Sequence, residues 1–477
     1  MRTQYKVKWV VNKERKFIMP EELIDINEAV ALEEKEVINM YRKNINPQLI
    51  KMFSMLNFDR CYVRAQGCSL FDEDGEEYLD FLGGYGALNF GHNPREIIEA
   101  VNKVEEFPDI MQAAPGKIEA AAAQNLARIS PGDLSRVFFT NSGTESVEGA
   151  IKLARAASDS NKIIYCDGSF HGKTMGSLSI TGREKYRKPF EPLLSETEVV
   201  SFGACEALEK KFSEDKVAAF ILEPIQGEGG IIVPPEGYLK QVRQLCNKYG
   251  VYFIIDEIQT GLGRTGYNFA CEREEVVPDI LCLAKSLGGG VVPAGAVVTR
   301  RKIWDKAYGS MEKALLHTST FGGNTRASAA VLQSLYILQN EKLSEKVREK
   351  GEYFLSGLKK ITSEYNLIEE VRGRGLMAGV EFKCPERNFL DRISGGLVKK
   401  YSGRYLGSIV AGILLNDYGI ITAYTLNNPL VIRLEPPLIV TYEEMDCVLQ
   451  AFSEIISNKS GMLDFALSGF RNMASKR

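Results

Sequence analysis

The fold class follows from one short stretch of sequence, VYFIID at residues 251–256. Five apolar or aromatic residues run without interruption and end on Asp256. A strand that is apolar at every position is typical of a parallel sheet, because such a sheet is covered on both faces. Asp256 then stands at the carboxyl end of the strand, where a carboxylate withdrawn from water needs a cationic partner. The alternatives for this acid are a helix N-cap or a salt bridge to Arg264 or Arg273.

The same pattern repeats on both sides of this stretch. Short apolar segments, which we expect to be strands, alternate with longer helical segments; the strands are 137–140, 163–166, 217–222, 280–283 and 294–298, and the helices include 145–157 and 238–249. This alternation predicts an α/β fold with a mainly parallel sheet. Polar residues follow the strands, at the edge where open α/β sheets hold their ligands: Asn141, Ser142, Asp167, Glu223, Asp256 and Lys285.

The chain beyond about Arg326 has a different organisation. Two helical stretches are followed by strand-like segments at 371–382 and 431–434, which predict a smaller α+β lobe. We place the domain boundaries at 1–95 for an N-terminal helical segment with part of the small domain, at 96–335 for the large domain and at 336–477 for the C-terminal small domain.

Residues 21–43 predict one amphipathic helix, since Leu23, Val30 and Val37 recur at intervals of seven residues. Its apolar side packs either on the core of its own chain or on a second subunit.

Composition excludes several classes of function. The 477 residues carry 59 basic and 62 acidic side chains, so the basic excess of a nucleic-acid-binding protein is missing. No apolar run approaches the ~18 residues that cross a bilayer. The first 20 residues are basic but lack a secretory apolar core and the serines of an organellar transit peptide, so we expect a cytoplasmic protein. Nine cysteines without a C-x-x-C pair predict neither a disulfide framework nor a zinc or other metal site.

Two glycine patterns could suggest a dinucleotide site. Gly261, Gly263 and Gly266 spell G-x-G-x-x-G, but five residues separate the strand from the first glycine and no helix opens after the last. A second near-match at 373–378 lies between two strand-like segments, where a tight turn explains it. An NAD-dependent dehydrogenase would depend on the first pattern alone.

A lysine and an acid at two strand ends suggest a different cofactor. Lys285 follows the strand at 280–283 and precedes three glycines that allow close backbone approach. A free lysine has a pKa near ~10.4, so a reactive lysine must be desolvated or held as an imine. Pyridoxal 5'-phosphate requires such a lysine, together with an acid for its pyridine nitrogen, a phosphate cup and a flat side chain against its ring. Asp256 is the candidate acid.

The remaining two requirements also have candidates at strand ends. The segment 141–145 joins a strand to a helix, so free backbone N–H groups and the hydroxyls of Ser142 and Thr144 form a natural anion site. An ordinary Ser/Thr helix cap is the alternative. Phe170 and His171 follow another strand and could supply the flat face, although an isolated pair of this kind would otherwise be read as core.

The segments that carry these residues closely resemble the class III aminotransferases. The resemblance runs from about residue 46 to residue 456, and its motifs lie at 141–145, 170–173, 223–230, 256–266 and 320–324. It implies the aspartate aminotransferase fold, PLP fold type I, with a large α/β domain and a smaller α+β domain. It also implies that the glycine pattern at 261–266 belongs to the loop after the cofactor aspartate.

The resemblance implies a role for each motif residue. Lys285 would be the imine lysine and proton shuttle, and Asp256 would pair with the pyridine nitrogen. The further implied contacts are Gln259 to the ring hydroxyl, Ser142, Gly143 and Thr144 to the phosphate, Phe170 and His171 to the ring, Glu223 to the pocket, and Thr320 to the phosphate of a neighbouring subunit. The last contact implies a homodimer with shared active sites.

Within that family the chain is most similar to putrescine aminotransferases, at 281–285, 317–320, 425–428 and 432–438. This implies transfer of an amino group from a primary amine, diamine or ω-amino acid to a 2-oxo acid such as 2-oxoglutarate or pyruvate. Arg433 resembles the arginine that binds the acceptor's carboxylate, and Glu223 the glutamate that engages or releases it. Arg433 could instead be paired with Glu435 or another local acid. An aminomutase or a decarboxylase on the same fold is the alternative function.

Overall fold

The computed structural model describes residues 23–363, 367–383 and 397–457. The first 22 residues, from which we expect no export signal, lie outside the described part. In the part that is described, no helix is both long enough and apolar enough to cross a membrane.

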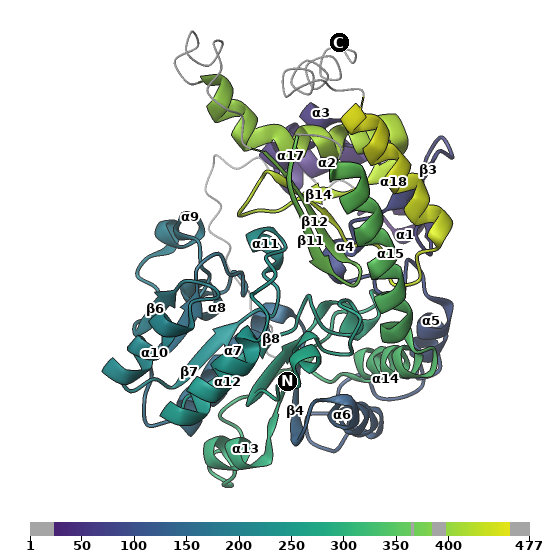
Figure 1. The fold of residues 1–477 in the computed structure, drawn as a ribbon. Helices are drawn as coiled ribbons and strands as arrows, with labels where there is room; N and C mark the ends of the chain where they lie inside the picture. The colour runs from purple at the N-terminus through teal and green to yellow at the C-terminus, as the bar shows by residue number, and fades with distance from the viewer. Residues whose placement is uncertain (1–22, 364–366, 384–396, 458–477) are drawn as a thin grey trace, which may run out of the picture.

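A seven-stranded sheet forms the centre of the large lobe (Figure 1). Its order is β4-β10-β9-β8-β7-β5-β6, and the pairs among β5 to β9 are parallel, whereas β10 is antiparallel to both of its neighbours. The strands are β4 (Leu134–Thr140), β5 (Ile163–Cys166), β6 (Thr197–Val200), β7 (Ala219–Leu222), β8 (Tyr252–Asp256), β9 (Ile280–Leu283) and β10 (Gly295–Arg300). All six strands expected from the apolar segments are present, and β6 was not foreseen. The predicted fold class is confirmed.

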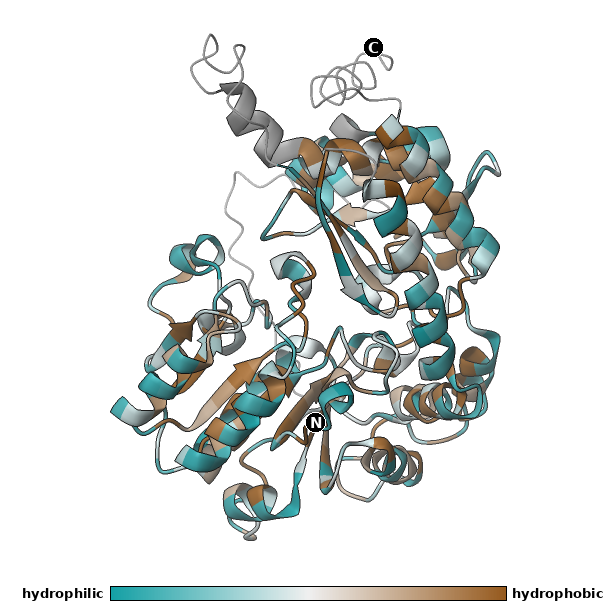
Figure 2. Ribbon diagram, in the orientation of Figure 1, coloured by the Kyte–Doolittle hydropathy of each residue, from teal (hydrophilic) through white to brown (hydrophobic). Residues whose placement is uncertain are grey.

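Strand β8 shows why its sequence forms part of this sheet. Successive side chains of a strand point to opposite faces. Phe253 and Ile255 pack in one apolar cluster with α12 (Tyr238–Tyr249), and Ile254 packs in a second cluster with α7 (Gly143–Ala157). Both faces are therefore buried, as Figure 2 shows by the brown strands among helices that turn teal residues outward.

The small lobe lies above this sheet in Figure 1 and contains a four-stranded sheet of order β11-β12-β15-β14. Its strands are β11 (Ile368–Arg374), β12 (Met377–Phe382), β14 (Ala423–Tyr424) and β15 (Val431–Leu434), and its helices are α15 (Leu343–Ser363), α17 (Leu397–Tyr418) and α18 (Tyr442–Ser457). Gly373 and Gly375 have φ values of 151° and 56° at the turn between β11 and β12. The tight turn predicted there is confirmed.

A third sheet joins the two ends of the chain. It contains β1 (Tyr62–Gln66), β2 (Ser69–Asp72), β3 (Glu77–Asp80) and β13 (Ile420–Ile421), with β3 and β13 parallel. The N-terminal segment thus shares a sheet with the C-terminal part, although the predicted domain boundaries stay a prediction.

The remaining helices connect or cover these sheets. They are α3 (Pro47–Leu56), α4 (Gly83–Gly86), α5 (Arg95–Asn102), α6 (Lys117–Ile129), α8 (Met175–Ser179), α9 (Glu184–Arg187), α10 (Cys205–Glu214), α11 (Gly227–Gly230), α13 (Arg301–Tyr308) and α14 (Thr325–Asn340), with 3₁₀ turns η1 (Lys188–Phe190), η2 (Ala270–Glu274) and η3 (Lys285–Gly288).

The single helix predicted over 21–43 is wrong. The structure has α1 (Ile26–Val30) and α2 (Glu34–Asn44), each preceded by its own capping box. A second capping box favours a new helix start, since it satisfies backbone N–H groups that a continuous helix would use internally. Leu23 and Val30 are 91% and 77% exposed, whereas Val37 in α2 is half-buried, so the N-terminal part of the apolar stripe does not pack on the core of its own chain.

Candidate active site

Asp256 is the last residue of β8, and its carboxylate is held at both oxygens. Its Oδ2 lies 2.8 Å from Nδ1 of His171, and its Oδ1 accepts a hydrogen bond of 3.1 Å from the backbone N–H of Ile258. The side chain is buried, so the protein fixes this acid in a water-poor position. Asp256 therefore pairs with neither Arg264 nor Arg273, the two arginines considered as alternative partners.

Lys285 lies beyond the same edge of the sheet. Asp256 is the register partner of Cys282 in β9, so Lys285 stands three residues past the level of Asp256, or about 10 Å along the chain direction. Lys285 has a φ of 50°, in the left-handed region, and its Nζ makes no hydrogen bond or ion pair with the part of the chain that the structure describes. A strained backbone at a lysine indicates that its position is imposed by the surrounding structure.

The surroundings of Lys285 prepare its amine for reaction. Burial lowers the pKa of Lys285, Glu435, Glu228 and Asp256 raise it, and Arg433 lowers it further. A lower pKa increases the fraction of neutral, nucleophilic amine. These four charged residues come from three separate segments, so the structure gathers the predicted lysine, acid and arginine at one place.

The predicted anion cup forms the start of α7. Ser142 is the N-cap and accepts a hydrogen bond from the backbone N–H of Glu145 at 3.4 Å. Thr144 Oγ1 lies 2.7 Å from the hydroxyls of Thr174 and Ser177. The helix is 15 residues long, and its terminus carries the partial positive charge that favours a phosphate.

Gly143 shows how close this terminus lies to the Asp256 loop. A Cβ added to Gly143 would lie 2.9 Å from Cδ1 of Ile258, two residues past Asp256. A side chain at residue 143 would therefore force the side chain of Ile258 to shift.

Phe170, His171 and Glu223 form one connected group. Glu223 Oε1 accepts a hydrogen bond of 2.8 Å from the Phe170 N–H, and its Oε2 accepts one of 3.1 Å from the Gly227 N–H. Burial raises the pKa of Glu223 to about 7, with His171 lowering it and Asp256 raising it. The contacts of Glu223 hold two loops together.

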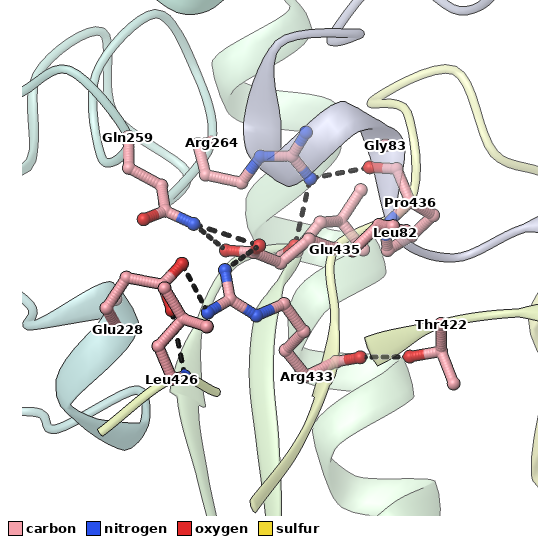
Figure 3. Close-up of polar contacts among 12 residues, drawn as sticks. Leu82, Gly83, Glu228, Gln259, Arg264, Thr422, Leu426, Arg433, Glu435 and Pro436 are labelled. Atoms are coloured by element: carbon pink, nitrogen blue, oxygen red, sulfur yellow. Dashed lines mark hydrogen bonds and ion pairs between the residues drawn. The ribbon is translucent and has the colours of Figure 1, made fainter. Parts of the chain in front are cut away.

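Arg433 pairs with Glu228 and not with Glu223. Its Nη2 lies 2.7 Å from Oε1 of Glu228, and its Nη1 lies 3.4 Å from Oε2 of Glu435 (Figure 3). The prediction that Glu223 engages this arginine is wrong, because Glu223 is already bound by two backbone N–H groups, whereas α11 carries Glu228 toward the small lobe. The structure agrees with the alternative interpretation, in which Arg433 pairs with Glu435 or another local acid.

Two further residues complete the environment of Arg433. The guanidinium lies 5.0 Å from the centre of the Tyr85 ring, a cation–π contact. Gln259 Nε2 donates to both oxygens of Glu435, at 2.8 and 2.9 Å. Gln259 thus links the Asp256 loop to Glu435, and its predicted contact with a ring hydroxyl stays a prediction.

The residues fit pyridoxal phosphate. Asp256, Lys285 and the helix terminus surround one region, and His171 presents a buried Nε2 that lacks a partner among the described residues. A family model described as aminotransferase class-III matches residues 53–456. The chain belongs to the class III aminotransferase family. The members of this family are pyridoxal-phosphate enzymes, and one similar structure, of an ornithine aminotransferase from Toxoplasma gondii, has this cofactor at partial occupancy in its active site.

Known relatives agree with this family. The chain is 37% identical to Aminotransferase PigE of Serratia sp. (strain ATCC 39006) over 462 residues, which cover 90% of this chain and 54% of that one. The chain therefore spans about half the length of this curated relative. An ornithine aminotransferase from Toxoplasma gondii ME49 has a TM-score of 0.79 at 30% identity, with 91% of this chain and 98% of that chain covered. An acetylornithine aminotransferase from Elizabethkingia anophelis has a TM-score of 0.72 at 30% identity, with 90% and 100% covered.

Thr320 lies at the surface of the chain. It is exposed, its carbonyl oxygen accepts a hydrogen bond of 2.8 Å from Gln112 Nε2, and it lines a surface pocket together with Ile110, Phe138 and His317. The neighbouring Ser319 accepts a hydrogen bond of 3.2 Å from Asn141, at the edge of the anion cup.

The glycine pattern at 261–266 has a structural role in this family member. No α-helix opens directly after it in the described chain, and its Arg264 is fully buried with hydrogen bonds to the carbonyl oxygens of Leu376 and Pro436 and to Oδ1 of Asn89, at 2.9, 2.5 and 2.6 Å. Arg264 thus joins the loop of the large lobe to the small lobe (Figure 3). The dinucleotide interpretation lacks the helix N-terminus that it requires.

Sequence reasoning missed Glu228, Tyr85 and Arg264 as members of the site. Glu228 lies inside the motif at 223–230, so its position was available, but only the geometry of α11 distinguishes it from Glu223. Arg264 likewise lies inside the motif at 256–266, but it was considered only as a partner of Asp256. Tyr85 carried no comparable signal.

Proposed function

We propose that this protein transfers the amino group of a primary amine, diamine or ω-amino acid, with putrescine as the type, to a 2-oxo acid such as 2-oxoglutarate or pyruvate. One observation carries the proposal: Arg433 forms an ion pair of 2.7 Å with Glu228, which occupies the guanidinium that would otherwise bind a carboxylate. Arg433 also lowers the pKa of Lys285, so the pair belongs to the surroundings of this lysine. With the pair closed, the pocket accepts a donor without a carboxylate. With Glu228 turned away, the same pocket accepts an oxo acid.

The relatives support the same class of donor. Two of the similar structures are named after their amino donors, ornithine and acetylornithine. Ornithine bears a terminal amine like that of putrescine. A third similar structure is a transaminase from the marine bacterium Virgibacillus, with a TM-score of 0.75 at 29% identity.

Each residue of the site has a part in this chemistry. When bound, pyridoxal phosphate supplies an electron sink and carries the amino group between the two substrates. Lys285 Nζ takes the proton from the donor carbon that bears the amino group, and it returns a proton to the corresponding carbon of the amino-acid product. Asp256, held by His171, keeps a proton on the ring nitrogen of the cofactor. The N-terminus of α7 holds the phosphate.

We also propose a homodimer in which Thr320 reaches the phosphate site of the partner. The exposure of Thr320 and its place in a surface pocket support this assignment. A particle mass near twice the 53.1 kDa of the chain is expected in light scattering. A monomeric mass in a fully active preparation would contradict it.

A panel of amines tests the function. Putrescine, cadaverine, ornithine, 4-aminobutyrate and longer amines are supplied with 2-oxoglutarate or pyruvate, and the visible absorbance of the bound cofactor is followed. We expect aldehyde formation that depends on the oxo acid. Turnover that needs no oxo acid, or release of carbon dioxide, would contradict a transaminase and indicate a decarboxylase or aminomutase.

Lys285→Ala is the central variant of this test. It is expected to lose the visible absorbance and at least ~10³-fold in turnover, since the amine that holds the cofactor and moves the proton is gone. Lys240→Ala is the matched control, because Lys240 is exposed and pairs only with the exposed Glu275 among the described residues.

A further inference from the structure

Glu435 is a buried acid that the transfer of an amino group does not require. It follows the last residue of β15, two residues after Arg433, so the two side chains point to the same face. It is fully buried, and its backbone N–H donates to the carbonyl oxygen of Phe81 at 2.8 Å. A buried carboxylate is costly unless it is paired.

The partners of Glu435 satisfy its hydrogen bonds but do not balance its charge. Both oxygens accept from Nε2 of Gln259, which is neutral, and Arg433 Nη1 is 3.4 Å away. Glu228 Oε1 lies 2.7 Å from Nη2 of the same guanidinium and forms an ion pair with it. Two carboxylates therefore share one arginine.

A second arginine does not change this balance. Arg264 donates to two carbonyl oxygens and an amide oxygen, and it has two acids nearby, Glu435 and Asp80. Arg264 makes no ion pair with Glu435 within the part of the chain that the structure describes, and Asp80 is paired with His92. Glu228 and Glu435 therefore share Arg433 as their single ion-pairing cation among the described residues, which leaves one negative charge. Lys285 supplies a cation only while it is protonated, and it must lose that proton to act as a nucleophile.

This arrangement has a consequence for each half of the reaction. When Glu228 turns away to admit an oxo acid, Glu435 stays beside Arg433, since it is fixed within the strand end and by Gln259. The arginine that receives the carboxylate is then still partly neutralised. In the amine half, the unbalanced negative charge attracts an ammonium group.

We propose that Glu435 is a specificity-determining residue that acts through Arg433: it weakens the binding of carboxylate substrates and favours donors that carry a second cationic group, such as diamines. The proposal depends on the proposed function, and it goes further by naming the donor class and the residue that selects it. Glu435 is a positioning residue in this scheme, because it is buried behind Arg433 and Gln259.

Glu435→Gln tests the proposal, since the amide keeps the shape and an oxygen for Gln259 but removes the charge. The two half-reactions are measured separately in the holoenzyme. We expect KM for 2-oxoglutarate to fall and KM for putrescine to rise, each about tenfold, with little change in either kcat. The ratio of kcat/KM for putrescine to that for 4-aminobutyrate is expected to fall by about tenfold.

A binding measurement separates this role from a structural one. Titration calorimetry uses two probes that cannot react, N,N,N',N'-tetramethyl-1,4-diaminobutane and glutarate. Glu435→Gln is expected to bind the diamine more weakly and glutarate more tightly. A structural role would weaken both or neither, and either result would overturn the proposal.

Two controls complete the design. Glu370→Gln removes an exposed acid that pairs with Arg372, and we expect it to change none of these values. If the wild-type enzyme transaminates no amine in the panel, the proposed function fails. If it does so and Glu435→Gln keeps the same substrate ratio, only the role of Glu435 fails.

Discussion

Nδ1 of His171 lies 2.8 Å from Oδ2 of Asp256, although 85 residues separate them in the chain. His171 follows β5, and Asp256 ends β8, two strands away in the sheet. The parallel pairing places both at the same edge, where the histidine can orient the acid. The oriented acid faces Lys285, which follows the next strand.

Replacing His171 tests whether this contact supports the chemistry. His171→Phe keeps a flat ring but removes the donor to Asp256. A hydrogen bond to a charged group contributes about 1.5–3 kcal/mol, so turnover and cofactor affinity are expected to fall about 10- to 100-fold. Cofactor dissociation and single-turnover rates give the measurement.

The chain offers a matched control for this variant. His92 and Asp80 form a similar pair at 3.0 Å, outside the group around Lys285. His92→Phe is expected to affect stability and to leave cofactor affinity unchanged. Equal losses of affinity in both variants would show that the effect of His171 is general destabilisation.

Replacing Arg433 tests the carboxylate site. Arg433→Lys keeps the charge near Glu228 and Glu435 but loses the planar fork that binds a carboxylate at two points. KM for the 2-oxo acid is expected to rise at least about tenfold, while the amine half-reaction changes little. Arg243→Lys, remote from the site and paired with Asp279 at 2.8 Å, is the control. An unchanged KM for the oxo acid would remove Arg433 from the acceptor site.

Glu257 predicts a pH dependence of stability. Burial raises its pKa from 4.5 to about 7, while hydrogen bonds from Thr260 Oγ1 and the Cys271 N–H lower it. Between these values the folded state keeps a proton that the unfolded state releases, so the contribution of Glu257 to stability falls as the pH rises through this window. The total loss is about 3 kcal/mol.

Unfolding by urea from pH 4.5 to pH 8 gives the measurement. The free energy of unfolding of Glu257→Gln is expected to rise relative to wild type across this range, whatever the difference at pH 4.5. Parallel curves for the two proteins would mean that Glu257 titrates normally in the fold.

A substitution at Gly83 tests how closely the backbones of Gly83 and Glu435 approach each other. It has a φ of 56°, and a Cβ there would lie 2.3 Å from the carbonyl oxygen of Glu435. Gly83→Ala is expected to destabilise the protein by about 3 kcal/mol or more, from backbone strain and overlap together. Gly75→Ala has the same kind of φ, 83°, with no atom within 4 Å, so strain alone is expected to cost about 1 kcal/mol. Equal losses in urea unfolding would exclude the overlap.

The sequence alone determined six of the seven strands of the large sheet and the members of the site that follow them. An uninterrupted apolar strand can be buried only on both faces, and its terminal polar residue must then lie at the sheet edge, so Asp256 and Lys285 were predictable from local pattern. The start of α7 was predictable for the same reason, because a Ser/Thr cap after a strand marks a helix terminus.

Tertiary structure alone decided which acid meets Arg433. Glu223 and Glu228 are five residues apart and equally acidic, but Glu223 is held by the N–H groups of Phe170 and Gly227, and α11 turns Glu228 toward β15. The break of the helix predicted over 21–43 has a similar cause: two capping boxes compete with one apolar stripe, and the energies of caps and packing are close enough that their balance is set by what surrounds the segment. Sequence pattern fixes where a side chain leaves its own element, and packing between distant elements fixes which side chain it meets.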